Sequence, residues 1–244
     1  MVKKKKILGI IPARYESTRF PGKVLAPING IPMVARVYQQ VCRTNLLDSV
    51  VVATDSRRVQ LTLEALKIPV RITSSGHKSG TERVAEVAEN SNADIFVNIQ
   101  GDEPFIDPDV IDLALKPFLE DESLKMGTVA STALSDENWE DPNTVKVQVS
   151  EDGFAEDFFR LYSGNESKNN IYKHVGLYVF DGKFLHKFAS MIPTKNEQES
   201  HLEQMRALDN GIPIKVVVTD YDGITVNTPE DLKLVEKHYG KTTY

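Results

Sequence analysis

Short apolar runs alternate with segments of helical spacing in the first half of the chain, and this alternation constrains the fold most. Each run is bounded by turn residues, and the runs cover residues 7–11, 50–53, 70–72 and 95–99. Between and after them, apolar residues recur three or four positions apart, as on one face of a helix. These are Met33, Val34, Val37 and Val41; Leu61, Ala65 and Leu66; Thr81, Val84, Val87 and Ala88; and Ile111, Leu115 and Leu119. Strands that alternate with helices predict a largely parallel sheet covered on both faces.

The second half of the chain has a different pattern. Val145, Val147 and Val149 alternate with polar residues, which predicts a strand with one solvated face, and 175–180 is a second strand. We expect a polar loop over 161–170, a long helix over about 197–210 that ends at Gly211, and a last helix capped by Thr228. The fold class is therefore α/β: one Rossmann-like domain over 1–244, with an antiparallel insertion at about 145–200.

Composition and charge exclude several classes of protein. The 244 residues carry a net charge of −6, which argues against a nucleic-acid partner that is bound by neutralising phosphates. No apolar run is long enough to span a membrane, and no signal peptide is visible, so we expect no membrane partner and a cytoplasmic location. The single cysteine, Cys42, excludes a disulfide framework within the chain, and we interpret it as a small buried hydrophobe of a helix.

The loop after the first strand concentrates positive charge. Arg14, Arg19 and Lys23 accompany the hydroxyls of Ser17 and Thr18 at the carboxyl end of a predicted strand, where open α/β sheets bind ligands. The spacing of its glycines fits neither a P-loop nor a dinucleotide fingerprint. Three clustered cations favour a polyphosphate ligand, although a solvated basic loop remains an alternative.

Asp102 is the strongest single candidate for chemistry. It follows the buried run 95–99 directly after Gly101. A carboxylate at a strand end, opposite cations that hold phosphates, suits Mg²⁺, which proteins bind through one or two carboxylates together with substrate phosphates. The alternative is an Asx turn, which needs no metal.

Several segments, taken in order, resemble one enzyme family. The first runs from Pro12 to Lys23, and later ones are Ser79-Gly-Thr-Glu-Arg83, Asn98-Ile-Gln-Gly-Asp102, His174-Val-Gly-Leu-Tyr178 and Leu202-Glu-Gln-Met-Arg206. Together they span most of the chain and resemble the 3-deoxy-manno-octulosonate (KDO) cytidylyltransferases, which activate an acidic sugar with CTP.

The resemblance implies a set of site residues. For the nucleotide they are Ala13, Arg14, Ser17, Arg19, Lys23, Ser79, Gly80, Arg83 and Gln100, of which Arg14 and Lys23 act in catalysis with Asp102. For the sugar they are His174, Tyr178, Glu203, Gln204 and Arg206. Asp102 and Asn227 would hold Mg²⁺, although the family has an aspartate at the second of these positions. Without the resemblance, Arg83 is better explained as a surface charge and Thr81 as a helix cap. No function is assigned to His77, His186, His201 or His238.

The reaction implied by the resemblance is the Mg²⁺-dependent transfer of CMP from CTP to the anomeric hydroxyl of KDO. Pyrophosphate leaves, CMP-KDO serves lipopolysaccharide biosynthesis, and the enzyme is expected to be a homodimer. Two alternatives stay open. One is a cytidylyltransferase for another acidic sugar, such as 8-amino-KDO or a nonulosonic acid. The other is a CTP-binding homologue without catalysis.

Overall fold

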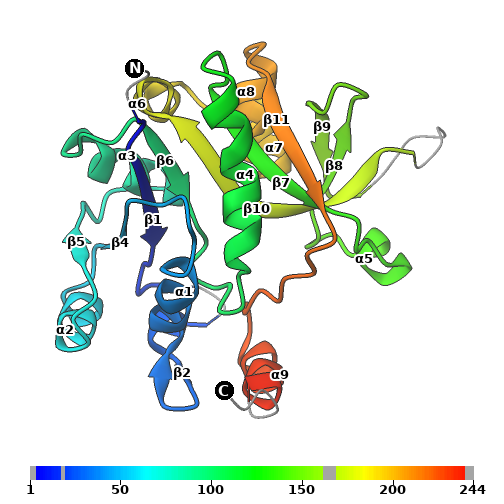
Figure 1. The fold of residues 1–244 in the computed structure, drawn as a ribbon. Helices are drawn as coiled ribbons and strands as arrows, with labels where there is room; N and C mark the ends of the chain where they lie inside the picture. Colours follow the sequence, from blue (N-terminus) through cyan, green and yellow to red (C-terminus); the bar gives the residue numbers. More distant parts are fainter. Residues whose placement is uncertain (1–3, 18–19, 162–168, 240–244) are drawn as a thin grey trace. The chain divides into compact units, whose positions relative to one another are not determined.

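The computed structural model describes residues 4–17, 20–161 and 169–239. The chain divides into two compact units (Figure 1). Unit 1 comprises Met1–Asp112 and Gly223–Tyr244, and unit 2 comprises Leu113–Asp222. That both units belong to one domain over 1–244 stays a prediction. No helix in the described residues is long and apolar enough to cross a membrane.

Unit 1 is built on a parallel sheet, as the alternating apolar runs predict. Its strands are β1 (Ile7–Pro12), β4 (Ser49–Thr54), β5 (Val70–Ile72) and β6 (Ile95–Asn98), in the order β6-β1-β4-β5. All pairs are parallel, so the carboxyl ends of all four strands lie at one edge. A small hairpin of β2 (Pro27–Ile28) and β3 (Ile31–Pro32), which the apolar pattern does not indicate, precedes the first helix.

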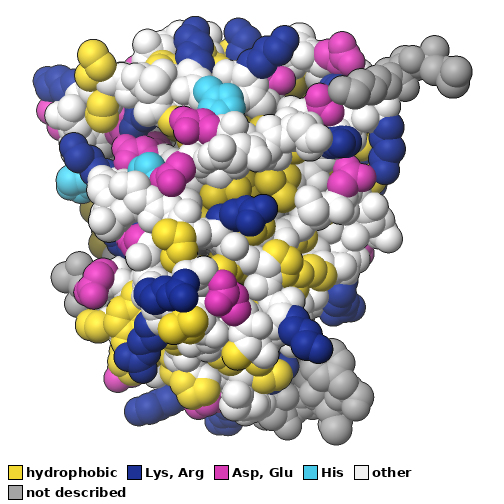
Figure 2. Space-filling view, turned by 90° about the vertical axis from the view of Figure 1, so that its left-hand side faces the viewer, with side chains coloured by type: hydrophobic (Ala, Val, Ile, Leu, Met, Phe, Trp, Pro, Cys, Tyr) yellow, Lys and Arg dark blue, Asp and Glu magenta, His cyan; other side chains and the backbone are white. Residues whose placement is uncertain are grey.

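Three helices of unit 1 separate the strands: α1 (Met33–Val41), α2 (Arg57–Ala65) and α3 (Gly80–Glu89). The predicted apolar faces of α1 and α3 are buried. The face predicted for α2 is wrong, because the helix buries Val59 and Leu63 and leaves Leu61 52% and Leu66 47% exposed. Figure 2 shows the side of the molecule that carries α2, where hydrophobic side chains lie among charged ones. Cys42 is exposed rather than buried, because α1 ends one residue before it.

The end of the chain returns to unit 1. Helix α9 (Pro229–Tyr239) begins as predicted, where the Asp231 amide donates to Thr228 Oγ1 at 3.2 Å. Val226 and Val235 are fully buried against Ile28 and Met33. The last segment therefore shares a hydrophobic cluster with the first forty residues.

Unit 2 has a mostly antiparallel sheet in the order β11-β7-β10-β8-β9. Its strands are β7 (Met126–Ser131), β8 (Lys146–Val149), β9 (Ala155–Phe159), β10 (Ile171–Asp181) and β11 (Ile214–Thr219). Only β11 and β7 run parallel among the described pairs of this unit. Its helices are α5 (Asp136–Glu140), α6 (Gly182–Ser190), α7 (Lys195–Ser200) and α8 (Met205–Asp209), and α4 (Pro108–Glu120) enters it from unit 1. The predicted antiparallel strands are therefore confirmed.

Two expectations for unit 2 are wrong. The face of β8 that carries Lys146 is not solvated: this side chain is fully buried, because its Nζ donates to the carbonyls of Asp141 and Arg160. The long helix over 197–210 is two short helices, because His201 takes a left-handed conformation (φ 55°) after α7. Gly211 does follow the second helix with φ 67°, as predicted. Of the polar loop, 162–168 lie outside the described residues.

Candidate active site

A cavity of about 390 Å³ lies in unit 1, beyond the carboxyl ends of β1, β5 and β6. This volume is within the range of small-ligand sites, roughly 300–1,000 Å³. Basic and polar side chains dominate its wall. The lining residues are Pro12, Arg14, Ser17, Lys23, Val24, His77, Lys78, Ser79, Gly80, Arg83, Gln100, Gly101, Asp102 and Asn227.

The loop after β1 supplies the first wall. Arg14, Ser17 and Lys23 line the cavity as predicted. Ala13 does not: its side chain is buried and its amide donates to the Ala53 carbonyl. Arg19 lies outside the described residues.

A turn at Gly22 returns this loop toward the sheet. Gly22 has φ 73°, and a Cβ built on it would lie 3.1 Å from the Tyr15 ring, so both the backbone conformation and the space favour glycine. The Gly22 amide donates to the Tyr15 carbonyl, and Arg58 of α2 donates to the Tyr15 hydroxyl at 2.7 Å. Tyr15 therefore connects the cavity loop to α2.

Lys23 and Asp102 form an ion pair at the cavity. Lys23 Nζ lies 2.5 Å from Asp102 Oδ2 and donates to the Val226 carbonyl at 3.1 Å. The Val226 amide in turn donates to the Asp102 carbonyl. The two side chains are only 16% and 20% exposed, so the attraction is stronger than that of a surface pair. Three segments distant in sequence therefore meet at one point.

The oxygen atoms that could act as metal ligands at this point suit a hard divalent cation. They are the Asp102 carboxylate and the Val226 carbonyl, with Asn227 lining the same cavity. All-oxygen ligands are those that Mg²⁺ prefers, and the Lys23 ammonium already places one positive charge against two of them. The described residues contain no group of three or more His, Cys, Asp or Glu that could hold a metal ion.

Gly101 sets how closely the Asp102 loop approaches β1. A Cβ at this position would lie 2.8 Å from the Pro12 carbonyl oxygen, closer than real Cβ atoms come. Glycine therefore allows Gln100 and Asp102 to line the cavity beside the end of β1, as the sequence predicts for both.

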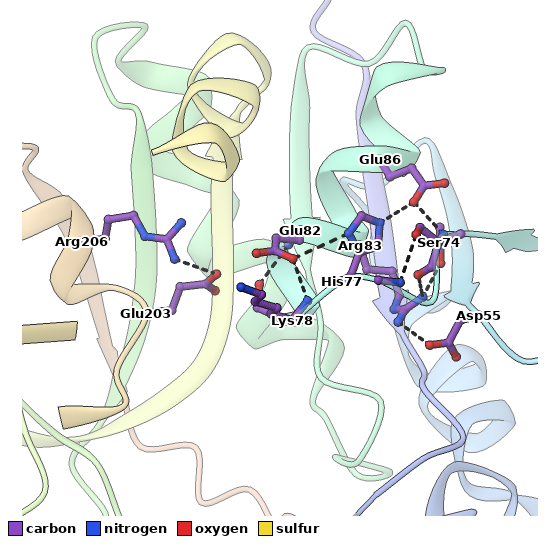
Figure 3. A network of polar contacts seen from close by, with 12 residues as sticks. Asp55, Ser74, His77, Lys78, Glu82, Arg83, Glu86, Glu203 and Arg206 are labelled. Carbon is purple, nitrogen blue, oxygen red and sulfur yellow. Dashed lines mark hydrogen bonds and ion pairs between the residues drawn. The ribbon is translucent and has the colours of Figure 1, made fainter. Parts of the chain in front are cut away.

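The start of α3 forms another part of the wall. Ser79 caps the helix, since its Oγ accepts from the Glu82 amide at 3.1 Å, and Gly80 follows it in the wall. Arg83 also lines the cavity, but its guanidinium is buried and donates to Asp55, to Thr73 and to a backbone carbonyl (Figure 3). It therefore joins the ends of β4 and β5.

His77 and Lys78 line the cavity, although sequence reasoning assigns nothing to either. His77 contacts Glu86 through Nε2, and Glu82 lies 3.7 Å from its Nδ1 (Figure 3). The two glutamates are four positions apart, so they share one face of a helix that starts six residues after Ser74. That spacing is the signal in the sequence that could have identified His77.

The residues predicted for the sugar lie in unit 2. His174 and Tyr178 share a face of β10, with their rings 5.5 Å apart, and His174 Nε2 lies 2.9 Å from Thr128 Oγ1. Tyr178 donates to Gln204 Oε1 at 3.1 Å, while Gln204 Nε2 is buried without a partner among the described residues. An amide donor left in this way is costly unless a ligand accepts from it.

Burial keeps the two rings of this cluster uncharged. It lowers the pKa of His174 to about 3. Burial, and to a smaller extent the Glu203 carboxylate, raise the pKa of Tyr178 above its ordinary value. At neutral pH the cluster therefore presents neutral hydrogen-bonding groups.

Arg206 forms several buried contacts within unit 2. Its guanidinium, only 5% exposed, makes a two-pronged ion pair with Glu197 and donates to the Phe188 carbonyl at 3.2 Å. Glu203 lies 3.7 Å away (Figure 3). These contacts explain why an arginine is buried at this position without any contact between Arg206 and the sugar.

The chain is similar to known proteins of one family. A family model described as cytidylyltransferase matches residues 8–216. The chain is 45% identical to the 3-deoxy-manno-octulosonate cytidylyltransferase of Pelobacter propionicus, over 93% of this chain and 94% of that protein. It is 47% identical to the one of Geobacter metallireducens, over 95% and 97%. A solved CMP:2-keto-3-deoxy-manno-octonic acid synthetase complexed with CTP has a TM-score of 0.91 at 35% identity and covers 97% of this chain and 99% of its own.

Proposed function

Given that this chain belongs to the 3-deoxy-manno-octulosonate cytidylyltransferase family, we propose that it transfers CMP from CTP to the anomeric hydroxyl of KDO and releases pyrophosphate. The observation that carries the proposal is the meeting of Lys23, Asp102 and the Val226 carbonyl at the carboxyl ends of parallel strands. A cation-rich wall with one carboxylate is the arrangement that a metal-bound triphosphate requires.

The cations of the wall would bind and orient the triphosphate. Arg14 is exposed in the β1 loop and is available for a two-pronged contact with phosphate oxygens. Lys23 offers three donors, two of which already point to oxygen acceptors. Holding the α-phosphate in line with the attacking hydroxyl contributes through proximity, and the fixed cations stabilise the charge that develops as pyrophosphate leaves.

Asp102 and Asn227 would hold the magnesium ion. When bound, Mg²⁺ neutralises phosphate charge and favours the ionised form of the sugar hydroxyl. Asparagine keeps a carbonyl oxygen that can coordinate but lacks the negative charge of aspartate, so this pair carries one charge where two aspartates would carry two.

The acidic sugar would be bound by the cluster in unit 2. Gln204 Nε2 is a buried donor that lacks an acceptor, and a carboxylate or a hydroxyl oxygen would satisfy it. His174 and Tyr178 add neutral hydrogen-bonding groups that orient an anion without trapping it as a full positive charge would.

Pyrophosphate release tests the proposal. The enzyme is incubated with Mg²⁺, CTP and KDO, and in parallel with ATP, GTP or UTP, and with 8-amino-KDO or a nonulosonic acid. We expect release only with CTP, and fastest with KDO. A faster reaction with another acidic sugar would identify a different acceptor, whereas CTP binding without release with any sugar would identify a homologue without catalysis.

We further propose a homodimer that acts in the cytoplasm, where its product would enter lipopolysaccharide biosynthesis. Exposed apolar side chains of unit 2 support self-association: Leu161 is 58% exposed, Ile192 85% and Val218 40%. Light scattering at micromolar concentration would give twice the chain mass of 27.3 kDa for a dimer, and a mass equal to that of one chain would refute the dimer.

A further inference from the structure

Two carboxylates of α3, those of Glu82 and Glu86, accept hydrogen bonds from the backbone of residues 74–79, the segment that brings Lys78 and Ser79 to the cavity. These contacts are called the grip below. Glu86 Oε2 accepts from the Ser74 amide at 2.8 Å, and Glu82 Oε2 accepts from the Lys78 amide at 2.7 Å. Because the glutamates are one helical turn apart, they hold both ends of the loop on the same face of α3.

His77 completes this grip from inside the loop. Its Nε2 contacts the same Glu86 oxygen that accepts from Ser74, and its Nδ1 lies 3.7 Å from the Glu82 oxygen that accepts from Lys78 (Figure 3). The imidazole is only 20% exposed, although the preceding residues Ser75 and Gly76 are exposed. It is the side chain that connects the middle of the loop to both carboxylates.

The remaining charges around the grip reinforce it. Although burial works to raise the pKa of Glu86, the Ser74 amide, His77 and Arg83 hold it below its ordinary value, so the acceptor is ionised at neutral pH. Arg83 donates hydrogen bonds to Thr73 and the Ser74 carbonyl at the start of the loop, and to Asp55. The loop is therefore fixed at its start by Arg83 and along its length by His77 with the two glutamates.

We infer that His77 is a positioning residue for nucleotide binding: it holds the 74–79 loop in the conformation that presents Lys78 and Ser79 to the part of the nucleotide that the proposed contacts of Arg14 and Lys23 with the triphosphate leave free. This inference rests on the proposed function for the identity of the nucleotide. A loop ordered before binding spares the nucleotide the entropic cost of ordering it, so the grip raises affinity without requiring that His77 touch the ligand.

Hydrogen exchange in the ligand-free protein tests the grip itself. The His77→Leu variant keeps the bulk and loses the donor, whereas His77→Gln keeps an N–H at similar reach. We expect the amides of 74–78 to exchange at least tenfold faster in His77→Leu and close to the wild-type rate in His77→Gln. The matched control is His186→Leu, an exposed histidine of α6, which should change nothing in this loop. Unchanged exchange in His77→Leu would overturn the inference.

Calorimetric binding tests the consequence. In His77→Leu we expect the Kd for CTP with Mg²⁺ to rise about tenfold and the Kd for inorganic tripolyphosphate, which lacks a base, to stay within twofold. Turnover at saturating CTP should stay near wild type, and His77→Gln should recover most of the affinity. Equal weakening of tripolyphosphate would show that His77 acts on phosphates, and unchanged CTP binding would show that the loop needs no grip.

The two proposals can fail separately. If the wild-type protein shows no preference for CTP, the proposed function fails, and the exchange rates of the ligand-free variants still decide whether His77 holds the loop. If the wild type binds CTP and both His77 variants behave like it, only the inference fails.

Discussion

Replacing Lys23 by methionine should change metal binding and nucleotide binding in opposite directions. In the ligand-free protein the ammonium occupies Asp102 Oδ2 at 2.5 Å and the Val226 carbonyl at 3.1 Å, so a metal ion must displace it. A hydrogen bond to a charged group contributes about 1.5–3 kcal/mol, and the 16% and 20% exposure of the partners places this one in the lower half of that range. At 1.4 kcal/mol per factor of ten, Mn²⁺ alone should bind roughly tenfold more tightly to Lys23→Met.

CTP should bind the same variant more weakly, because the triphosphate loses one of its cations. We expect a loss of about ten- to a hundredfold at fixed Mg²⁺. Mn²⁺ binding is measured by electron paramagnetic resonance without nucleotide, and CTP binding by calorimetry. Arg14→Met is the matched control: Arg14 lines the same cavity and has no contact with Asp102 among the described hydrogen bonds, so its loss should weaken CTP and leave Mn²⁺ alone unchanged.

One result would refute the reasoning directly. If Lys23→Met binds Mn²⁺ alone no better than wild type and Arg14→Met, the ammonium does not compete with metal for Asp102. Near-ultraviolet circular dichroism of the variants checks that the fold is retained, so a loss of structure is not mistaken for a loss of binding.

Three further predictions concern other residues of the site. Asn227→Asp should lower the Mg²⁺ concentration for half-maximal pyrophosphate release, and an unchanged dependence would exclude a metal contact. Burial keeps His174 neutral in the folded protein down to about pH 3, whereas the imidazole of the unfolded chain takes up a proton below about pH 6.5. The free energy of unfolding should therefore decrease as the pH is lowered from 6.5 to 3, by at most about 1.4 kcal/mol per pH unit. His174→Gln should reduce this dependence on pH. Arg206→Met should lower the free energy of unfolding in urea by about 3–5 kcal/mol, because the Glu197 carboxylate, which is only 11% exposed, loses its ion-pair partner. Near-native stability with weaker KDO binding would instead make Arg206 a sugar ligand.

Much of unit 1 could be predicted from the sequence because its signals are local. The four apolar runs of the parallel strands are continuous, since both faces of such a sheet are covered, and each of their boundaries differs from the structure by one residue at most. Lys23 and Asp102 were found because ligands of α/β sheets gather at the carboxyl ends of strands.

The errors arose where distant contacts decide the outcome. Lys146 looks like a solvated position, and only the carbonyls of Asp141 and Arg160 explain its burial. The helix predicted over 197–210 is interrupted at His201, and no glycine or proline at this position indicates the interruption in the sequence. The sequence does not identify His77, because its place at the cavity depends on contacts with Glu82 and Glu86, which the sequence marks only as residues of a helix.

The return of the chain to unit 1 at Gly223 has a consequence for synthesis on the ribosome. Lys23 and Asp102 emerge early, but the Val226 carbonyl and Asn227 emerge only after the whole of Leu113–Asp222 has been translated. At about 5–20 residues per second, this stretch of 110 residues takes roughly 6–22 s. A nascent chain therefore carries an incomplete cavity for that time, and messages truncated near their end would yield a protein that has its sheet and lacks one wall of its cavity.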